Sequence, residues 1–386
     1  MAISTVMIAG TIAAQKTDPA PLSLFPVRTL WTLALNNSLT VLPVYSGSHA
    51  YFSIDGDRLV AYDLTRGLQE WITPADPEFE PAAGDGLLFI SEPGSLRAIR
   101  MRDGSTAWKL PASGVPGIPR IDDALAVAPV WDNGWLVLAA RSGELLVLRA
   151  IDGHVVWRRA LGSRAHAQPS LAADRVYLPL ADGRIVALRI DTGDVVWERR
   201  LGGAPTGLLA LDDRVYAGSN DNFFYALDAA DGRVQWRWRT GADVVGVPVV
   251  DERNIYFVSL DNVLRALSRR TGVQQWARLL PLRPTRGPLK VDPTIIVSGV
   301  APALRAYNVK DGTPAGELPG TGELAGPPYA VPGSSAGLPQ LLVVRHDIGK
   351  GATATLLTRQ IDPALSPFTP PPNAIKVMPL PDVRED

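Results

Sequence analysis

Short apolar stretches alternate with clusters of turn-forming residues along most of this chain. In a representative unit, four such stretches occupy residues 206–210, 214–218, 223–228 and 233–239. Asn220, Asp221 and Asn222 separate the second stretch from the third, and Asp231 and Gly232 separate the third from the fourth. Asn and Asp tolerate a left-handed backbone and Gly adopts it freely, so these residues favour hairpin turns. The pattern predicts four short antiparallel strands per unit.

A skeleton of Ala-x-Asp-x-x-x-Gly-x-x-x-Trp returns along the chain at steps of 37 to 49 residues, mostly 40. Each of six tryptophans lies four residues after a glycine and ten after Ala or Val. A seventh copy keeps Ala306 and Gly312 but has Gly316 in place of the tryptophan, and Trp31 stands forty residues before the first full copy. A period near forty with four strands per unit is typical of a β-propeller.

The two ends of the array are incomplete in complementary ways. Residues 24–35, which carry Trp31, form an outer strand without inner strands, whereas residues 325–331, 340–345 and 353–360 form three strands without an outer one. Pairing them would remove an open sheet edge from the ring. We therefore predict an all-β fold: an eight-bladed β-propeller of four-stranded antiparallel blades, spanning residues 24–361, whose N-terminal strand completes the last blade.

The repeated tryptophans are interpreted as structural docking residues. Each indole would face a small residue on the third strand of an adjacent blade and close the gap between two twisted sheets. Stacking on a sugar or a base is the alternative interpretation, but one tryptophan per blade, locked to an alanine, favours packing. The predicted docking residues are Trp31, Trp71, Trp108, Trp157, Trp197, Trp236 and Trp276.

Prolines recur at a second fixed place in the repeat. They fall where the innermost strand of each blade should begin, next to the central channel, where a missing N–H costs least. The residues are Pro43, Pro81, Pro129, Pro169, Pro248, Pro288 and Pro328.

Composition narrows the range of functions. The 386 residues carry a formal charge of −1, with 38 basic and 39 acidic residues spread along the chain, so no footprint for nucleic acid is present. Cysteine is absent, which excludes disulfides and thiol nucleophiles. The four histidines, His49, His154, His166 and His346, are isolated and show no zinc spacing. No nucleophile elbow or phosphate loop occurs.

The two ends lie outside the repeat. Residues 1–20 are interpreted as a signal-like or disordered terminus: residues 2–14 are small and apolar and resemble a secretory signal that lacks its positively charged start, and a frayed apolar terminus without a signal is the alternative. The segment is too short to span a bilayer as a helix. Residues 362–386 form a proline-rich tail, predicted to be extended.

The Ala-x-Asp-x-x-x-Gly-x-x-x-Trp repeat resembles the docking motif of propellers of the pyrroloquinoline-quinone (PQQ) type, in particular those of quinoprotein alcohol dehydrogenases and of BamB, a lipoprotein of outer-membrane assembly. The resemblance covers roughly residues 24–360. It implies an exported, monomeric, non-enzymatic scaffold of the periplasm or cell envelope that holds a protein partner, such as an outer-membrane assembly component, without a cofactor. The cysteine that anchors BamB lipoproteins is missing.

Two alternatives stay open. A quinoprotein dehydrogenase would need PQQ and Ca²⁺, but the vicinal disulfide of that family cannot form here. Its acidic and amide candidates, Glu80, Asp122, Asp123, Asp243 and Asn254, show no dense ligand spacing. The second alternative is a sensor or binding module that uses the central channel, with His166, Gln168, Thr206 and Arg286 as candidate lining residues.

Two departures from the repeat are candidates for partner binding or for protection of the fold. A Gly- and Pro-rich insertion at residues 111–123 precedes Trp131, Asp132 and Trp135, which would anchor a partner if exposed and would pack within the blade otherwise. Arginines that follow the docking tryptophans are interpreted as charges that block edge-to-edge pairing of the outer strands. These are Arg158, Arg159, Arg199, Arg200, Arg237, Arg239 and Arg278.

Overall fold

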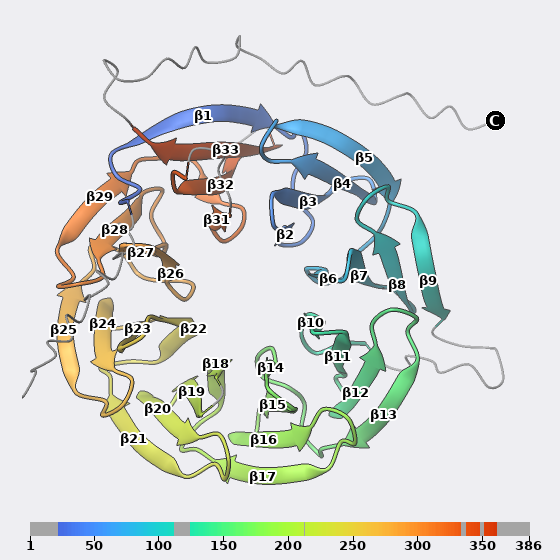
Figure 1. Ribbon diagram of the computed structural model, residues 1–386, viewed down its shortest axis with the longest axis vertical. Helices are drawn as coiled ribbons and strands as arrows, with labels where there is room; N and C mark the ends of the chain where they lie inside the picture. Colours follow the sequence, from blue (N-terminus) through green and yellow to red (C-terminus); the bar gives the residue numbers. More distant parts are fainter. Residues whose placement is uncertain (1–21, 112–123, 212, 333–336, 348–350, 361–386) are drawn as a thin grey trace, which may run out of the picture.

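A computed structural model describes residues 22–111, 124–211, 213–332, 337–347 and 351–360. These residues form a closed ring of eight antiparallel sheets around a central axis, and no helix occurs among them (Figure 1). No helix long and apolar enough to cross a membrane is found in this part of the chain. The predicted eight-bladed β-propeller is therefore confirmed.

The first four blades run from the innermost to the outermost strand in chain order. Blade 1 contains β2 (Val44–Ser46), β3 (His49–Ile54), β4 (Arg58–Asp63) and β5 (Leu68–Pro74). Blade 2 contains β6 (Ala82–Gly84), β7 (Leu87–Glu92), β8 (Ser95–Arg100) and β9 (Thr106–Pro111). Blade 3 contains β10 (Val130–Asp132), β11 (Trp135–Ala139), β12 (Glu144–Arg149) and β13 (Val155–Ala160). Blade 4 contains β14 (Ser170–Ala172), β15 (Arg175–Pro179), β16 (Arg184–Arg189) and β17 (Val195–Arg200).

The next three blades repeat the same order. Blade 5 contains β18 (Pro205–Ala210), β19 (Arg214–Ser219), β20 (Phe223–Asp228) and β21 (Val234–Arg239). Blade 6 contains β22 (Val244–Val250), β23 (Asn254–Ser259), β24 (Val263–Ser268) and β25 (Gln274–Leu279). Blade 7 contains β26 (Leu289–Val291), β27 (Thr294–Val297), β28 (Leu304–Asn308) and β29 (Pro314–Leu318). The strands predicted for the fifth unit match blade 5 to within one residue at each end.

Blade 8 joins the two ends of the chain. Its second and third strands are β32 (Gln340–Asp347) and β33 (Gly351–Arg359), and its outer strand is β1 (Val27–Ala34). The pairing of β1 with β33 runs from Val27 opposite Arg359 to Ala34 opposite Thr353, as the sequence predicted. The inner edge differs from the prediction of one strand at residues 325–331, because β30 (Glu323–Leu324) and β31 (Tyr329–Val331) pair separately with β32.

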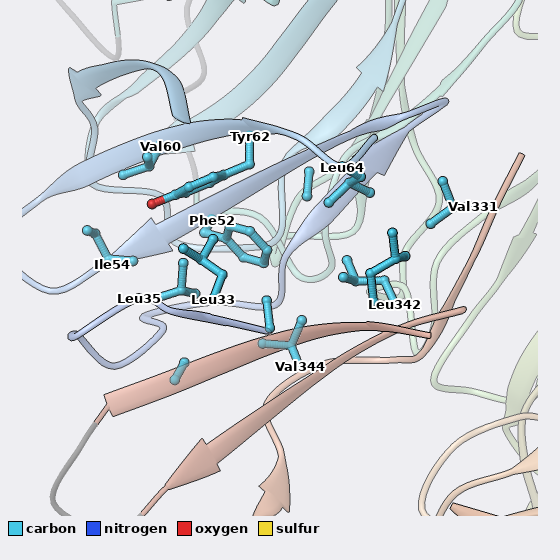
Figure 2. Packing of buried hydrophobic residues seen from close by; sticks show 14 residues of the cluster. Leu33, Leu35, Phe52, Ile54, Val60, Tyr62, Leu64, Val331, Leu342 and Val344 are labelled. Atoms are coloured by element: carbon cyan, nitrogen blue, oxygen red, sulfur yellow. The ribbon is translucent and has the colours of Figure 1, made fainter. Parts of the chain in front are cut away.

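The hydrophobic core lies between successive blades, so it is distributed around the ring. Figure 2 shows the cluster that spans the junction of blades 8 and 1. Leu33 and Leu35 from the N-terminal segment pack there with Phe52 of β3 and with Val344 of β32, and all four are buried. The strand that closes the ring is thus held by apolar packing as well as by its backbone hydrogen bonds.

The repeated prolines stand immediately before the innermost strands in six blades, as predicted. Pro248 is the exception, because it lies inside β22, where the register shifts between Val245 and Val249. A bulge leaves this N–H position outside the ladder, so proline is tolerated there as well.

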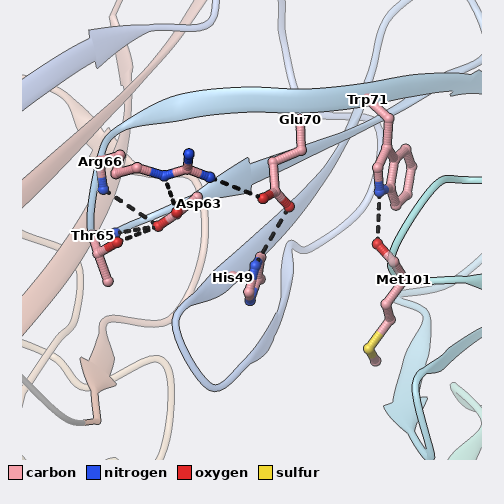
Figure 3. A network of polar contacts seen from close by, with 7 residues as sticks. All are labelled: His49, Asp63, Thr65, Arg66, Glu70, Trp71 and Met101. Carbon is pink, nitrogen blue, oxygen red and sulfur yellow. Dashed lines mark hydrogen bonds and ion pairs between the residues drawn. The ribbon is translucent and has the colours of Figure 1, made fainter.

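The docking tryptophans correct one part of the sequence interpretation. Trp71 lies directly opposite Ala61 of its own blade, not opposite an alanine of an adjacent one. Its indole covers Gly104 in the next blade, where an added Cβ would lie 2.8 Å from Cε3 of the indole, so a side chain has no room. The indole N–H donates to the carbonyl of Met101 in that same blade at 2.6 Å (Figure 3).

The same arrangement recurs around the ring. Six indoles lie against the glycine of the next motif, which has a positive φ in every copy. All seven indole N–H groups donate to a backbone carbonyl of the following blade, at distances between 2.6 and 3.0 Å. The acceptors are Leu64, Met101, Ala150, Ile190, Ala229, Arg269 and Val309.

The aspartate of the motif shapes the turn that carries the glycine. Asp63 Oδ1 accepts hydrogen bonds from the backbone N–H of Thr65 at 2.8 Å and from its hydroxyl at 2.6 Å (Figure 3). Burial raises the pKa of Asp63, but these bonds and those from Arg66 outweigh it and lower the pKa to about 2. The carboxylate therefore stays ionised and closes the turn through local hydrogen bonds.

The seam, by which we mean the junction of blades 7 and 8 next to the strand that closes the ring, explains why the seventh motif lacks its tryptophan. The third and fourth strands of blade 8, β33 and β1, come from opposite ends of the chain, so no turn joins them and no docking glycine follows blade 7. Instead, Phe25 lies over Gly316, where an added Cβ would be 2.1 Å from Cδ1 of the ring. At six other junctions the indole comes from the earlier blade and the glycine from the later one. Here the order is reversed, because the aromatic ring comes from blade 8 and the glycine from blade 7.

Candidate functional site

Polar side chains from three blades meet at the end of the channel where the innermost strands begin. Gln168, just before β14 of blade 4, donates from Nε2 to Oε1 of Glu80, just before β6 of blade 2, at 3.1 Å. The hydrogen bond therefore joins blades 2 and 4, which are separated by blade 3 in the ring. The charge of Arg286, which precedes β26 of blade 7, acts on the same carboxylate. Two of the predicted channel residues, Gln168 and Arg286, are thus brought together with Glu80.

The electrostatics of this cluster reflect its partial burial, since Glu80, Gln168 and Arg286 are all half-buried. Burial raises the pKa of Glu80, and the hydrogen bond from Gln168 and the charge of Arg286 offset part of that rise. Burial also lowers the pKa of the Arg286 guanidinium, which the charge of Glu80 counteracts. No ion pair or hydrogen bond holds the Arg286 side chain in the described ranges, so its donors are available to a ligand.

Two stacked tyrosines lie near this cluster, and one of them, Tyr45, interacts electrostatically with Arg286. Tyr45 of β2 and Tyr329 of β31 stack with ring centroids 4.5 Å apart and an interplanar angle of 12°. The Tyr329 hydroxyl donates to the carbonyl of Gly47 at 2.9 Å. The Tyr45 hydroxyl oxygen is buried and has no hydrogen-bond partner in the part of the chain that the structure describes. Burial raises the pKa of Tyr45, which keeps this hydroxyl protonated.

The other two predicted channel residues do not join the cluster. The Thr206 hydroxyl donates to the carbonyl of Val244 at 2.7 Å and so links blade 5 to blade 6. Beside it, an added Cβ on Gly207 would lie 2.4 Å from the carbonyl oxygen of Gly246, which shows how closely the two innermost backbones approach. His166 is exposed, and its backbone N–H donates to Pro179 at 2.9 Å.

The candidate partner anchors lie partly inside the ring. Trp131 of β10 is half-buried and covers Gly84 of β6, whose added Cβ would lie 1.9 Å from the indole, while its N–H donates to Asp85 at 3.3 Å. Trp135 of β11 is half-buried and packs on the core between blades 3 and 4. Asp132 is exposed. The geometry of both indoles matches the packing alternative, and residues 112–123 of the insertion lie outside the described residues.

The acidic candidates for a metal site are scattered. The Asn254 side chain donates to the Tyr256 hydroxyl at 3.4 Å, and the Asp243 carbonyl accepts from the N–H of Leu260 at 2.8 Å. Asp122 and Asp123 are not among the described residues. Within the described residues, no three His or acidic side chains come close enough to hold a metal ion. Glu80 therefore has no partner carboxylates there for Ca²⁺.

Three arginines have a role that the sequence analysis missed. Arg199, two residues after Trp197, donates from Nε to the carbonyl of Gly232, the glycine that Trp197 covers, at 2.8 Å. Arg159 and Arg278 bond Gly193 and Gly312 in the same way, each at 2.7 Å. The edge-blocking interpretation is wrong for these three residues, because the side chain of each one donates a hydrogen bond to a backbone carbonyl of the next blade.

Comparison with known proteins places these features in a family. The family model described as outer membrane protein assembly factor BamB matches residues 28–126, 94–210 and 201–325. The outer membrane protein assembly factor BamB of Yersinia pestis is 24% identical over 162 residues, which is 39% of this chain and 41% of the relative.

Solved structures support the fold. The crystal structure of BamB from Moraxella catarrhalis superposes with a TM-score of 0.68 at 19% identity, covering 86% of this chain and 99% of that one. The quinohemoprotein alcohol dehydrogenase of Comamonas testosteroni gives a TM-score of 0.65 at 13% identity, covering 86% and 76%. At these identities the structures show the architecture alone. The family model, which matches most of the propeller, shows that this chain belongs to the BamB family of PQQ-type propellers.

Proposed function

We propose that the protein is a non-enzymatic, protein-binding scaffold of the cell envelope that takes part in the assembly of outer-membrane proteins. The observation that carries this proposal is the match of the BamB family model over three overlapping stretches from residue 28 to residue 325. The name of the Yersinia pestis relative supports the same process, although this chain spans less than half of that relative.

The architecture suits a scaffold. Every blade except blade 7 is tied to the next by a docking indole and its hydrogen bond to a backbone carbonyl, and at three of these junctions an arginine also bonds the next blade. Such a ring presents the turns of all blades in a fixed arrangement, and a rigid surface loses little entropy when a partner binds. The dehydrogenase alternative rests on a likeness of fold, and fold alone does not carry an activity.

The proposal is tested by crosslinking in the native host. The full-length protein, tagged at its C-terminus, is crosslinked in living cells, and captured proteins are identified by mass spectrometry after fractionation. The expected result is one or a few envelope proteins, with crosslinks confined to one face of the ring. Recovery of the protein in the cytoplasm, or capture of itself alone, would contradict the scaffold function.

The Glu80–Gln168–Arg286 cluster favours a second candidate function, in which the channel end binds a small ligand. Arg286 offers unused donors and Glu80 an acceptor, and both residues are half-buried. A thermal-shift screen of small organic acids and of PQQ with Ca²⁺ would reveal such a ligand. A shift that Arg286→Gln abolishes would support the channel site, and a shift that this variant leaves unchanged would place the ligand elsewhere.

A further inference from the structure

Blade 6 departs from the repeat at two positions that meet in space. In blades 1 to 7, the residue whose carbonyl receives the docking indole also donates its N–H to the turn between the first and second strands. The donor is Arg269 in blade 6, whereas the other six blades have apolar residues there: Leu64, Met101, Ala150, Ile190, Ala229 and Val309. The acceptor is Arg253 in blade 6, whereas the other blades have Ser48, Gly86, Gly134, Asp174, Asp213 and Pro293.

These arginines line a cleft between blades 5 and 6. The cleft has a volume of about 690 Å³, and its charged lining consists of Arg214, Arg253, Arg269, Arg270, Asp213 and Glu252. Four positive and two negative side chains leave a net charge of +2. The chain as a whole has a charge of −1, so this excess is local. We refer to this site as the blade 5–6 cleft.

The docking motif holds the cleft in shape. The carbonyl of Arg269 accepts the indole N–H of Trp236 at 3.0 Å and the hydroxyl of Tyr216 at 3.4 Å. The Arg269 side chain donates from Nη1 to the carbonyl of Asp251 at 2.9 Å. The turn that carries Arg270 is therefore anchored from the neighbouring blade before any ligand arrives, which limits the entropy lost on binding.

Two of the four guanidinium groups in the cleft have no partner among the described residues. The side chains of Arg253 and Arg270 belong to exposed residues and make no hydrogen bond or ion pair within the described ranges. A guanidinium offers its N–H groups in a planar fork that matches a carboxylate or a phosphate in two parallel hydrogen bonds. The cleft therefore presents two such forks, one from each of the two turns of blade 6.

The surroundings favour a polypeptide over a membrane surface. Turns on the same side of blades 4 and 5 carry Asp174, Asp191 and Asp231, all of which are exposed. The hydrogen bond from Arg189 lowers the pKa of Asp191, so this side chain is ionised at neutral pH. Each of these aspartates pairs with an arginine, so this face outside the cleft offers a flat anionic bilayer no excess of positive charge, whereas a narrow acidic segment can enter the cleft, where the excess lies.

We propose that the blade 5–6 cleft binds an acidic segment of a protein partner through carboxylates paired with Arg253 and Arg270. This inference rests on the proposed scaffold function and adds to it the place and the chemistry of partner recognition. Asn254 and Gln275 also line the cleft; their side-chain N–H groups donate to the Tyr256 hydroxyl and the Val273 carbonyl, which leaves their amide oxygens as acceptors for the backbone N–H groups of such a segment.

The test uses charge reversal with a matched control. The test variant is Arg253→Glu/Arg270→Glu, and the control is Arg102→Glu/Lys310→Glu. Arg102 and Lys310 are the exposed equivalents of Arg270 in blades 2 and 7, and both variants change the net charge by the same amount. The probe is a fluorescein-labelled hexaglutamate peptide with capped ends, measured by fluorescence anisotropy at low and moderate salt. Circular dichroism checks that both variants are folded.

We expect the wild type and the control to bind the peptide, with affinity falling as salt rises, and the test variant to lose at least about tenfold in affinity. Equal binding by the test variant and the control would overturn the inference. Flotation of the wild type with phosphatidylglycerol vesicles, lost only in the test variant and without peptide binding, would assign the cleft to lipid phosphate instead.

In-cell crosslinking of the same two variants separates this inference from the scaffold function. If the wild type captures a partner and the test variant captures it equally well, the cleft is refuted and the scaffold function stands. If the wild type captures no partner, the scaffold function fails, whatever the peptide shows. Loss of the partner in the test variant alone supports both.

Discussion

Replacing Trp197 with alanine tests how the ring is held together. The side chain is 7% exposed, its N–H donates to the Ala229 carbonyl at 2.9 Å, and it lies against Gly232 of the next blade. Truncating a buried tryptophan costs about 3–5 kcal/mol. The Ala229 carbonyl keeps a second donor, Arg175 Nη1, so the lost indole hydrogen bond adds less than about 1 kcal/mol. Because the site lies at the outer edge of the junction, where water can enter the space left behind, we expect a net loss of about 4 kcal/mol.

Urea denaturation, followed in parallel by far-ultraviolet circular dichroism and tryptophan fluorescence, measures this loss. Val196→Ala is the matched control, since Val196 precedes Trp197 on β17 and is 37% exposed, and it should change stability by less than about 0.5 kcal/mol. Trp197→Phe should fall between the two, because it keeps a ring over Gly232 but has no N–H donor. A loss below about 1 kcal/mol for Trp197→Ala would refute the docking role.

Three further predictions follow from the same geometry. Gly232→Ala should destabilise the protein by at least about 1 kcal/mol in urea denaturation, because φ is +69° and an added Cβ would lie 2.6 Å from the Trp197 indole; an unchanged midpoint would contradict the close approach. Arg199→Ala should lose about 1 kcal/mol in the same assay, and Arg239→Ala less than half as much, because Arg239 of β21 is exposed and its side chain makes no hydrogen bond or ion pair within the described residues; equal losses would count against the contribution of the Arg199–Gly232 hydrogen bond. The pKa of Asp63, about 2 in the folded protein against an ordinary 3.8, means that its contribution to stability is present above about pH 4 and is lost as the pH falls towards 2. Asp63→Asn should therefore flatten the acid side of the stability curve, measured by thermal unfolding from pH 7 to pH 2.5, and an unchanged slope would show that Asp63 does not gain these hydrogen bonds on folding.

The sequence by itself determined the architecture, because the information for it is local and repeated. The turn residues at Asn222 and Gly232, both with positive φ, set the hairpins of blade 5. The spacing of the motif set the number of blades, and the complementary ends predicted that β1 would pair with β33. Such features depend on neighbours a few residues apart or on a period, and both can be counted in a single sequence.

Only the tertiary structure decided which blade each side chain reaches. Trp197 and Arg199 bond residues 32 and 33 positions ahead, across a junction whose twist the repeat does not specify. Glu80 and Gln168 meet although 88 positions separate them, because three blades of the ring bring their innermost ends to one place. Phe25 replaces the missing tryptophan only because the seam reverses the order of ring and glycine. The blade 5–6 cleft depends in the same way on two turns of one blade and one turn of its neighbour, and its charge becomes visible only when those turns are brought together.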